Sequence, residues 1–331
     1  MINTLLTVVV PTYNMESLLG KCLDSLVVEN KGLEVLVVID GATDNSSAIA
    51  HRYEEEHPDI FRVIDKENGG HGSCCNVGLK EAKGKYIHFL DSDDWFDEKL
   101  PIFLDKLSSE TADVVFSKRV DEYSDSNNMK IHSIGLDYDK TYDFSSVDIK
   151  NIRHDIFSLH ECTFSVDLLR NNGVMFLEHC SYDDTILRIA AFPRVKTISL
   201  YNITLYHYLL GRTGQSVDKK TFAKKLNQFI DNYNYLFDYC NKVERNLNDN
   251  SRMFCSKVLE KYSLWVFREV WECSYNTSDR YKKLYKIKSI LGNKDNYQWV
   301  KHMKIANAFY NYPLFICFLY HWYCYKKGKL Y

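Results

Sequence analysis

Short apolar runs alternate with helix-patterned segments through the first hundred residues. The β-branched, apolar runs cover residues 7–10, 34–39, 62–64 and 86–90. Runs of this length that end in turn-forming residues predict buried strands. Between the first two, apolar side chains recur at helical spacing over residues 18–27, and Asn14 stands where the N-cap of that helix is expected. This alternation predicts the α/β class, with a mostly parallel sheet covered by helices on both faces.

Polar clusters follow three of the predicted strands at the points where the strands end. They cover residues 11–14, 40–44 and 91–94, and Asp44 is also a suitable cap for a helix that runs through about Glu56. A loop with three glycines at 68–73 leads into another predicted helix near 74–82. Ligands of open parallel sheets bind beyond the carboxyl ends of the strands. The three clusters therefore predict a ligand site at one edge of the sheet.

The third cluster, Asp91-Ser92-Asp93-Asp94, places three carboxyl groups within four residues. At the end of a buried strand these groups would repel one another and lose hydration unless a cation compensates them. Oxygen ligands suit a hard cation such as Mg²⁺ or Mn²⁺ that is shared with a phosphate. Asp and Ser also form ordinary turns, so these four residues alone leave both interpretations open.

Four motifs together resemble the inverting glycosyltransferases of family 2, which have the GT-A nucleotide-sugar-binding fold, a Rossmann-like arrangement. The motifs are Val-Val-Pro-Thr-Tyr-Asn at 9–14, Val-Val-Ile-Asp-Gly-Ala-Thr-Asp at 37–44, Asn-Gly-Gly-His-Gly-Ser-Cys-Cys-Asn-Val-Gly-Leu at 68–79 and Asp-Ser-Asp-Asp at 91–94. The resemblance is strong over residues 5–105 and moderate over 155–217. The chain has Ile39-Asp40 where the family usually has two consecutive Asp, which puts the detail of base recognition in question.

The resemblance implies a role for each matching residue in binding the nucleotide sugar. Asp91 and Ser92 would lie near the ribose, and Asp93, with Asp91, would hold Mn²⁺ or Mg²⁺ on the diphosphate, while Asp94 would cap the following turn. The other implied contacts with the nucleotide are Pro11, Thr12 and Tyr13 lining its pocket, Asp40 facing the base or ribose, and Gly70, Ser73 and Asn76 lying alongside it.

An inverting transfer needs a general base near the acceptor hydroxyl. Family members often carry Glu-Asp ahead of an apolar helix, with the Asp as base, and this chain has Asp183-Asp184 before Thr185-Ile186-Leu187. The resemblance therefore puts Asp184 in the base position and Asp183 in the Glu position, with Asp183 kept as a second candidate. The structural alternative is that Asp183 is an N-cap and Asp184 an acid in the first helical turn. A structural role and a catalytic role can coexist.

Several further residues have two interpretations each. Arg212 lies in a glycine loop that resembles the segment closing over the donor, where it would bind the diphosphate, or it is simply a solvated loop residue. His71 has three glycines around it and would contact the sugar nucleotide. His207 is more readily a packed strand histidine than a metal ligand. The segment His160-Glu161-Cys162-Thr163 resembles an acceptor-side segment of capsule-type relatives.

Composition is that of a globular protein, and the charge is uneven along the chain. The 331 residues are 26% charged and 45% hydrophobic, with a net charge of −2. Residues 251–331 nevertheless carry 15 Lys or Arg against five Asp or Glu. We expect a catalytic domain at 1–217, with a nucleotide-binding part at 1–105 and an acceptor-side part at 106–217. Residues 218–331 are expected to form a mostly helical region.

The segment 306–331 is rich in aromatic residues and ends in a lysine cluster. Its apolar run is too short to span a bilayer but suits an interfacial helix on an anionic membrane surface. The alternatives are a helix packed on the protein or a homodimer contact. Ten scattered cysteines without Cys-x-x-Cys pairs, and a start that leads directly into the first strand, predict a cytoplasmic protein. The segment 306–331 predicts that it associates with the cytoplasmic face of the membrane.

Two classes of function remain open. The first is a metal-dependent inverting glycosyltransferase that moves a sugar from a nucleoside diphosphate, with uridine favoured, to a growing surface glycan or lipid-linked oligosaccharide. The second is a non-catalytic nucleotide-sugar-binding or scaffold subunit on the same fold. A nucleotidyltransferase is disfavoured because its first strand usually leads into a Gly-rich basic loop rather than Pro-Thr-Tyr-Asn. Nucleic-acid binding is not expected, because no recognition motif accompanies the basic charge.

Overall fold

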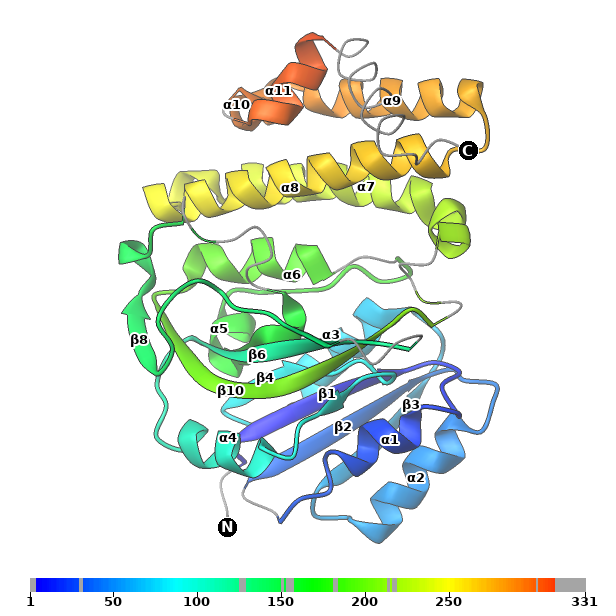
Figure 1. Cartoon of the computed structure of the whole chain (residues 1–331), viewed down its shortest axis with the longest axis vertical. Helices are drawn as coiled ribbons and strands as arrows, with labels where there is room; N and C mark the ends of the chain where they lie inside the picture. The colour runs from blue at the N-terminus through cyan, green and yellow to red at the C-terminus, as the bar shows by residue number, and fades with distance from the viewer. Residues whose placement is uncertain are drawn as a thin grey trace. The chain divides into compact units, whose positions relative to one another are not determined.

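A computed structural model describes residues 4–29, 32–124, 129–149, 152, 158–180, 184–212, 215, 219–301 and 303–312 (Figure 1). The chain divides into two compact units, Met1–Gln215 and Ser216–Tyr331. The first unit contains all the motifs identified in the sequence, and the second is helical.

Four parallel strands form the first half of the sheet in unit 1, in the order β3-β2-β1-β4. They are β1 (Leu6–Thr12), β2 (Leu33–Asp40), β3 (Phe61–Lys66) and β4 (Tyr86–Phe89). All residues of β1, β2 and β4 are buried, as expected of strands covered on both faces. These are the four strands predicted from the apolar runs.

Helices cover both faces of these strands. α1 (Leu19–Asp24), α2 (Ser46–Glu56) and α4 (Leu100–Leu107) share one apolar core with the strand residues Leu6, Val8 and Val10. α3 (His71–Glu81) packs on the opposite face, where a Cβ on Gly78 would lie 2.3 Å from the Val9 side chain. Glycine at 78 therefore allows α3 to approach the sheet closely.

An antiparallel strand separates this half of the sheet from the second half. β9 (Cys162–Ser165) pairs antiparallel with both β4 and β6 (Val114–Tyr123), and β6 then pairs parallel with β10 (Thr197–Leu210). The remaining strands pair with β6 or β10: β5 (Trp95–Phe96), β7 (Met129–Ile131) and β8 (Lys140–Asp143). The short helices of this part are η1 (Phe144–Ser146), η2 (Leu159–Glu161), α5 (Val166–Asn171), α6 (Asp184–Ala191) and η3 (Phe192–Arg194).

The predicted N-cap at Asn14 is wrong. Asn14 has a positive φ of 52°, and its side-chain oxygen accepts a hydrogen bond from the backbone N–H of Thr43 at 2.8 Å. The N-cap position of α1 is Leu18 instead. Asp44 lies one residue further from its helix than predicted, but its carboxylate still accepts from the N–H of Ser46 in the first turn at 3.0 Å. Asn14 thus links two loops at the sheet edge and does not start a helix.

Unit 2 consists of helices packed through aromatic side chains. The Tyr233 and Tyr262 rings stack with centroids 5.7 Å apart, and the Tyr262 hydroxyl donates to the Phe229 carbonyl at 3.2 Å. The helices are α7 (Lys219–Val243), η4 (Glu244–Asn246), α8 (Asp249–Cys273), α9 (Thr277–Leu291), α10 (Lys294–Val300) and α11 (Lys304–Asn311). The α/β class with a helical C-terminal region agrees with the sequence prediction. Across the described ranges, every helix is too short or too polar to cross a membrane.

Candidate active site

Asp40, the last residue of β2, is buried and fully engaged with the glycine loop that follows β3. Its carboxylate accepts from the backbone N–H groups of Gly69 and Gly70, each at 2.8 Å, and from Nζ of Lys66 at 2.7 Å. Burial opposes ionisation, but these hydrogen bonds outweigh it and lower the pKa of Asp40 below its usual value. Asp40 therefore holds the glycine loop as a charged anchor.

The glycine loop is shaped by contacts that leave no space for larger side chains. Gly70 has a φ of 85°, and a Cβ on Gly69 would lie 2.6 Å from Oγ of Ser73. Ser73 accepts a hydrogen bond from Lys66 at 2.8 Å and donates one to the Gly70 carbonyl at 2.8 Å. The loop thus enters α3 in a compact form that larger side chains at positions 69 and 70 would disturb.

Asp91 follows β4 and lies between two imidazoles. Nε2 of His71 is 3.3 Å from one of its oxygens, and Nε2 of His160 is 3.3 Å from the other. Burial would raise the pKa of Asp91, but the hydrogen bonds from His160 and His71 lower it below the usual range. His71, which was predicted to contact the sugar nucleotide, is thereby placed beside the acidic loop.

Asp94 is buried, and its carboxylate is bound to β10. It accepts from the Tyr206 hydroxyl at 2.6 Å and from the backbone N–H of Leu209 at 2.8 Å. Its predicted role as a cap of the following turn is therefore wrong. Burial, followed by the charges of Asp91 and Asp93, raises the pKa of Asp94 well above its usual value.

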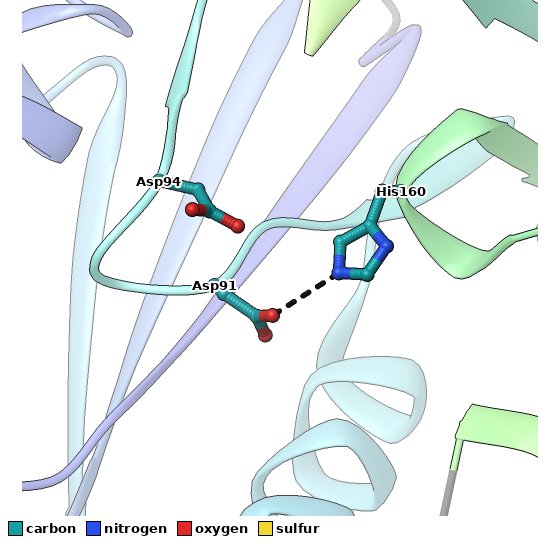
Figure 2. A group of neighbouring side chains, drawn as sticks. All are labelled: Asp91, Asp94 and His160. Carbon is teal, nitrogen blue, oxygen red and sulfur yellow. Dashed lines mark hydrogen bonds and ion pairs between the residues drawn. The ribbon is translucent and has the colours of Figure 1, made fainter. Parts of the chain in front are cut away.

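Asp91, Asp94 and His160 form a group that could hold a metal ion (Figure 2). One ligand atom from each lies within 4.8 Å of the others. Two carboxylates and one imidazole nitrogen suit Mn²⁺ and related divalent cations, so the donor set fits the predicted metal. Asp93, predicted as a ligand beside Asp91, is paired with the guanidinium of Arg212. The structure therefore brings His160 and Asp94 into the candidate metal group and places Arg212 next to the acidic loop.

His207 follows the packed-strand interpretation. Its Nδ1 lies 2.6 Å from Glu122, its Nε2 lies 3.0 Å from Asp97, and its ring stacks on Trp95 with centroids 5.5 Å apart. Both ring nitrogens are thus directed at carboxylates other than those of the candidate metal group.

Asp184, the predicted base, is the first residue of α6. Its carboxylate is partly exposed and lies 3.8 Å from the guanidinium of Arg188, one helical turn further on. α6 packs against η2, the short helix that carries His160. Asp183, the second candidate, lies outside the described residues. The predicted base thus lies at a helix start, where a carboxylate is favoured by the helix dipole.

Contacts between α3 and the segment before α6 join the glycine loop to the region of the predicted base, Asp184. Asn76 donates to the Phe176 carbonyl and to Glu178, each at 3.0 Å, and accepts from the Phe176 N–H at 2.8 Å. The N–H of His179 donates to the Gly69 carbonyl at 2.6 Å. Asn76 therefore positions the segment leading to Asp184, while its predicted contact with the nucleotide stays a prediction.

The remaining predicted residues lie at the same edge of the sheet. Pro11 and Thr12 end β1 and are buried, Tyr13 is 49% exposed, and Ser92 is buried in the acidic loop. β1 lies between β2 and β4 in the sheet, so its end falls between Asp40 and Asp91. Their roles in nucleotide binding remain predictions that fit this placement.

His160 is the site residue that sequence reasoning missed. It was assigned only to a segment resembling an acceptor-side region, although it contacts Asp91, 69 residues earlier in the chain. The contact arises because η2 leads into β9, the antiparallel strand beside β4, and no periodicity in the sequence predicts that pairing. The one available signal was the resemblance of the segment His160-Glu161-Cys162-Thr163 to a family segment.

Comparison with known proteins gives consistent results. Residues 7–171 match the model of glycosyl transferase family 2. EpsH of Bacillus subtilis is 28% identical over 255 residues, covering 72% of this chain and 70% of EpsH. A poly(ribitol-phosphate) beta-glucosyltransferase of Bacillus spizizenii is 29% identical over 218 residues, covering 63% of this chain and 33% of that protein. For two of the curated relatives, one of them this beta-glucosyltransferase, the chain spans only 21% and 33% of the relative's length.

Among solved structures, residues 1–349 of Staphylococcus aureus TarS in complex with UDP-GlcNAc superpose with a TM-score of 0.65 at 19% identity. The match covers 87% of this chain and 80% of that one. Together with the family model, it confirms the predicted GT-A fold.

Proposed function

Because the chain belongs to glycosyl transferase family 2, we propose that it is a metal-dependent, inverting glycosyltransferase that uses a nucleoside-diphosphate sugar. The observation that carries the proposal is the convergence of Asp91, Asp94 and His160 at the sheet edge that also holds the Asp40-anchored glycine loop. The first unit would be the catalytic domain, predicted as residues 1–217, and residues 218–331 its helical extension.

The relatives support a choice of donor and acceptor classes to test. TarS was crystallised with UDP-GlcNAc and with UDP, which makes UDP-sugars the first donors to test. One relative is named a poly(ribitol-phosphate) beta-glucosyltransferase and another a minor teichoic acid biosynthesis protein. These names support a growing surface glycan or a lipid-linked oligosaccharide as the acceptor class.

In the proposed reaction, Asp184 takes the proton of the acceptor hydroxyl as its oxygen attacks the anomeric carbon from the side opposite the diphosphate. The carbon–oxygen bond to the diphosphate breaks, and the configuration at the anomeric carbon inverts. A divalent cation held at Asp91, Asp94 and His160, with Asp93 beside them, would offset the charge that develops on the leaving diphosphate. Arg212, which pairs with Asp93, is close enough to the acidic loop to bind the same diphosphate.

The scaffold alternative predicts binding without turnover. A donor screen distinguishes the two: several nucleotide sugars are incubated with the protein and Mn²⁺ or Mg²⁺, and release of the nucleoside diphosphate is measured with and without EDTA. We expect release from at least one donor, most readily a UDP-sugar, and loss of release in EDTA. Tight nucleotide-sugar binding without release, even when glycan or lipid-linked acceptors are supplied, would favour the scaffold. Full release in EDTA would contradict the metal dependence.

We also propose that the protein works at the cytoplasmic face of the membrane and attaches there through residues 306–331. Within this segment, Phe309 of α11 is buried against Phe267, with ring centroids 4.2 Å apart, as the packed-helix alternative predicts. Residues 313–331 lie outside the described part of the chain, so the support for membrane attachment is their sequence, with its aromatic run and terminal lysines. Such a position would bring a lipid-linked acceptor to the catalytic unit.

A further inference from the structure

The imidazole of His160 is held by a chain of polar side chains on the side opposite Asp91. Its Nδ1 lies 2.7 Å from Oγ of Ser158, and Nη1 of Arg119 donates to the same oxygen at 2.9 Å. Asp121 fixes Arg119 through Nε at 2.9 Å and is itself contacted by Nε2 of His132 at 2.7 Å. Asp121 is buried, so the chain starts from an anchored charge.

Two aromatic rings fix the plane of the imidazole. The His160 ring centroid lies 4.6 Å from that of Tyr208 and 4.9 Å from that of Tyr206. Arg119 lies over the outer part of this cluster, 5.4 Å from the Tyr208 ring. Both the position and the rotation of the imidazole are thus determined, and its Nε2 is directed at Asp91 (Figure 2).

The Ser158 hydroxyl can serve both neutral tautomers of His160. A hydroxyl has one hydrogen to donate and two lone pairs, one of which accepts from Arg119. When Nε2 carries the proton and donates to Asp91, the hydroxyl donates to Nδ1. When Nδ1 carries the proton, the hydroxyl turns and accepts from it with its second lone pair. Nε2 then has a free lone pair facing Asp91 and Asp94.

We propose that His160 is a nitrogen ligand of the divalent cation in this site, and that Ser158, held by Arg119, is the positioning residue that makes Nε2 available. The proposal rests on the metal dependence proposed above. A metal ion would take the lone pair of Nε2, and the ring proton would then reside on Nδ1, where the Ser158 hydroxyl can accept from it. An imidazole nitrogen favours Mn²⁺ over Mg²⁺, and the site should show that preference.

Pulsed electron paramagnetic resonance of bound Mn²⁺ tests the ligand directly. The protein is labelled with ¹⁵N, loaded with Mn²⁺ and unlabelled UDP, and examined for ¹⁵N coupling, which cannot come from the uracil. We expect a coupled nitrogen in the natural protein and its loss in His160→Asn. His71→Asn is the matched control, because His71 lies at the same 3.3 Å from Asp91 but outside the candidate metal group. It should keep the signal.

Three results would overturn the assignment. Bound Mn²⁺ without any ¹⁵N coupling in the natural protein would mean that only oxygen atoms hold the metal. A signal that survives in His160→Asn and disappears in His71→Asn would assign the ligand to the other imidazole. Failure of Mn²⁺ to bind at all would remove the site. The spectrum of the natural protein decides the first and third cases even if a variant does not fold.

The role of Ser158 is tested by Mn²⁺ affinity in the presence of saturating UDP. Ser158→Ala removes the acceptor for Nδ1–H and should weaken Mn²⁺ binding about 10-fold or more, the usual effect of removing a second-sphere partner. Ser158→Thr keeps the hydroxyl and should bind within about twofold of the natural protein. Equal affinity in Ser158→Ala would contradict the positioning role.

These tests separate this inference from the proposed function. If diphosphate release needs Mn²⁺ but no nitrogen is coupled to it, the enzyme proposal stands and the role of His160 fails. If release persists in EDTA, the metal dependence itself fails.

Discussion

Asp40 and the acidic loop 91–94 lie at the same edge of the sheet, but their surroundings stabilise the charged carboxylates to different extents. Asp40 has one cation and two backbone N–H groups within 2.8 Å, and its pKa is lowered. In the acidic loop, the pKa of Asp91 is lowered by two imidazoles, whereas that of Asp94 is raised by burial and by its neighbours. The anion of Asp40 is thus stabilised by its own fold, whereas burial and the charges of Asp91 and Asp93 disfavour the anion of Asp94.

This difference indicates a structural role for Asp40 and a chemical role for the acidic loop within one site. A charge that accepts three hydrogen bonds from a loop holds the shape of that loop and gains little from a ligand. A cluster in which one carboxyl group is disfavoured as an anion gains stability when a cation arrives. We therefore expect changes at Asp40 to affect folding first, and changes in the acidic loop to affect metal binding and turnover first.

The largest effect is expected from the acidic loop. Asp91→Asn removes a carboxylate of the candidate metal group, and Asp93→Asn removes the partner of Arg212. Both variants should keep the fold and lower turnover about 10²-fold or more, because stabilisation of the leaving diphosphate by the metal is worth several kcal/mol. Steady-state diphosphate release and circular dichroism measure the two properties. Asp93→Asn with full activity in EDTA would contradict its role.

A loss of similar or smaller size is expected at the base. Asp184→Asn should lower kcat by roughly 10²-fold, with little change in donor affinity. Asp167→Asn is the matched control, since Asp167 is also an acid in the first turn of a short helix, α5, and is exposed. It should retain activity. An inactive Asp183→Asn together with an active Asp184→Asn would show that the neighbouring carboxylate is the base.

Asp40→Asn should act on stability instead. The buried Asp40 carboxylate and Lys66 lose a charge-assisted contact, so we expect a loss of about 2–3 kcal/mol in the free energy of unfolding at pH 7, measured by urea titration. Glu55→Gln, at an exposed position of α2, should change it by less than about 0.5 kcal/mol. Loss of turnover in Asp40→Asn at unchanged stability would contradict a mainly structural role for Asp40.

The pH dependence of that loss follows from the sign of the shift. The folded-state pKa of Asp40 is below its ordinary 3.8, so its stabilisation is fully present above that value and is lost as pH falls through the folded-state pKa. The stabilities of the natural protein and Asp40→Asn should therefore converge only below about pH 4. A difference that disappears between pH 5 and 7 would assign the stabilisation to another group.

The smallest effect on the site is expected from the tail. Removing residues 306–331 also removes the buried Ala306 and Phe309 from the helical unit. It leaves Asp40 and the acidic loop of the first unit in place, so donor hydrolysis should remain nearly intact. The truncated protein should no longer co-sediment with anionic vesicles, and binding of the full chain should weaken with salt without vanishing, because apolar burial does not depend on ionic strength. Equal sedimentation of both forms, or an insoluble truncated form, would indicate a packing or dimer element.

The sequence predicted the four parallel strands and the shared edge of Asp40 and Asp91 because the signals for them are local. β1 to β4 are apolar runs with polar residues at their ends, and parallel pairing brings Asp40 and Asp91 to one edge. The rest of the candidate metal group depends on pairings between distant segments. The antiparallel insertion of β9, the contact between His160 and Asp91, and the binding of Asp94 to Leu209 have no local pattern.

Errors in the prediction have a physical cause as well. Asn14 has the residue type and spacing of an N-cap, but an asparagine also tolerates a positive φ, and here it ties the end of β1 to Thr43. Asp94 stands in a turn, yet its side chain is buried against β10. In both cases a tertiary contact replaced the local one that the sequence suggested.

The most direct test of the central claim, that the acidic loop holds a divalent cation on the nucleotide diphosphate, is calorimetric titration of UDP into the natural protein and into Asp91→Asn, each with Mn²⁺ and with EDTA. We expect chelation by EDTA to weaken UDP binding at least about tenfold in the natural protein and far less in Asp91→Asn. Equal UDP affinity with Mn²⁺ and with EDTA in the natural protein would contradict it.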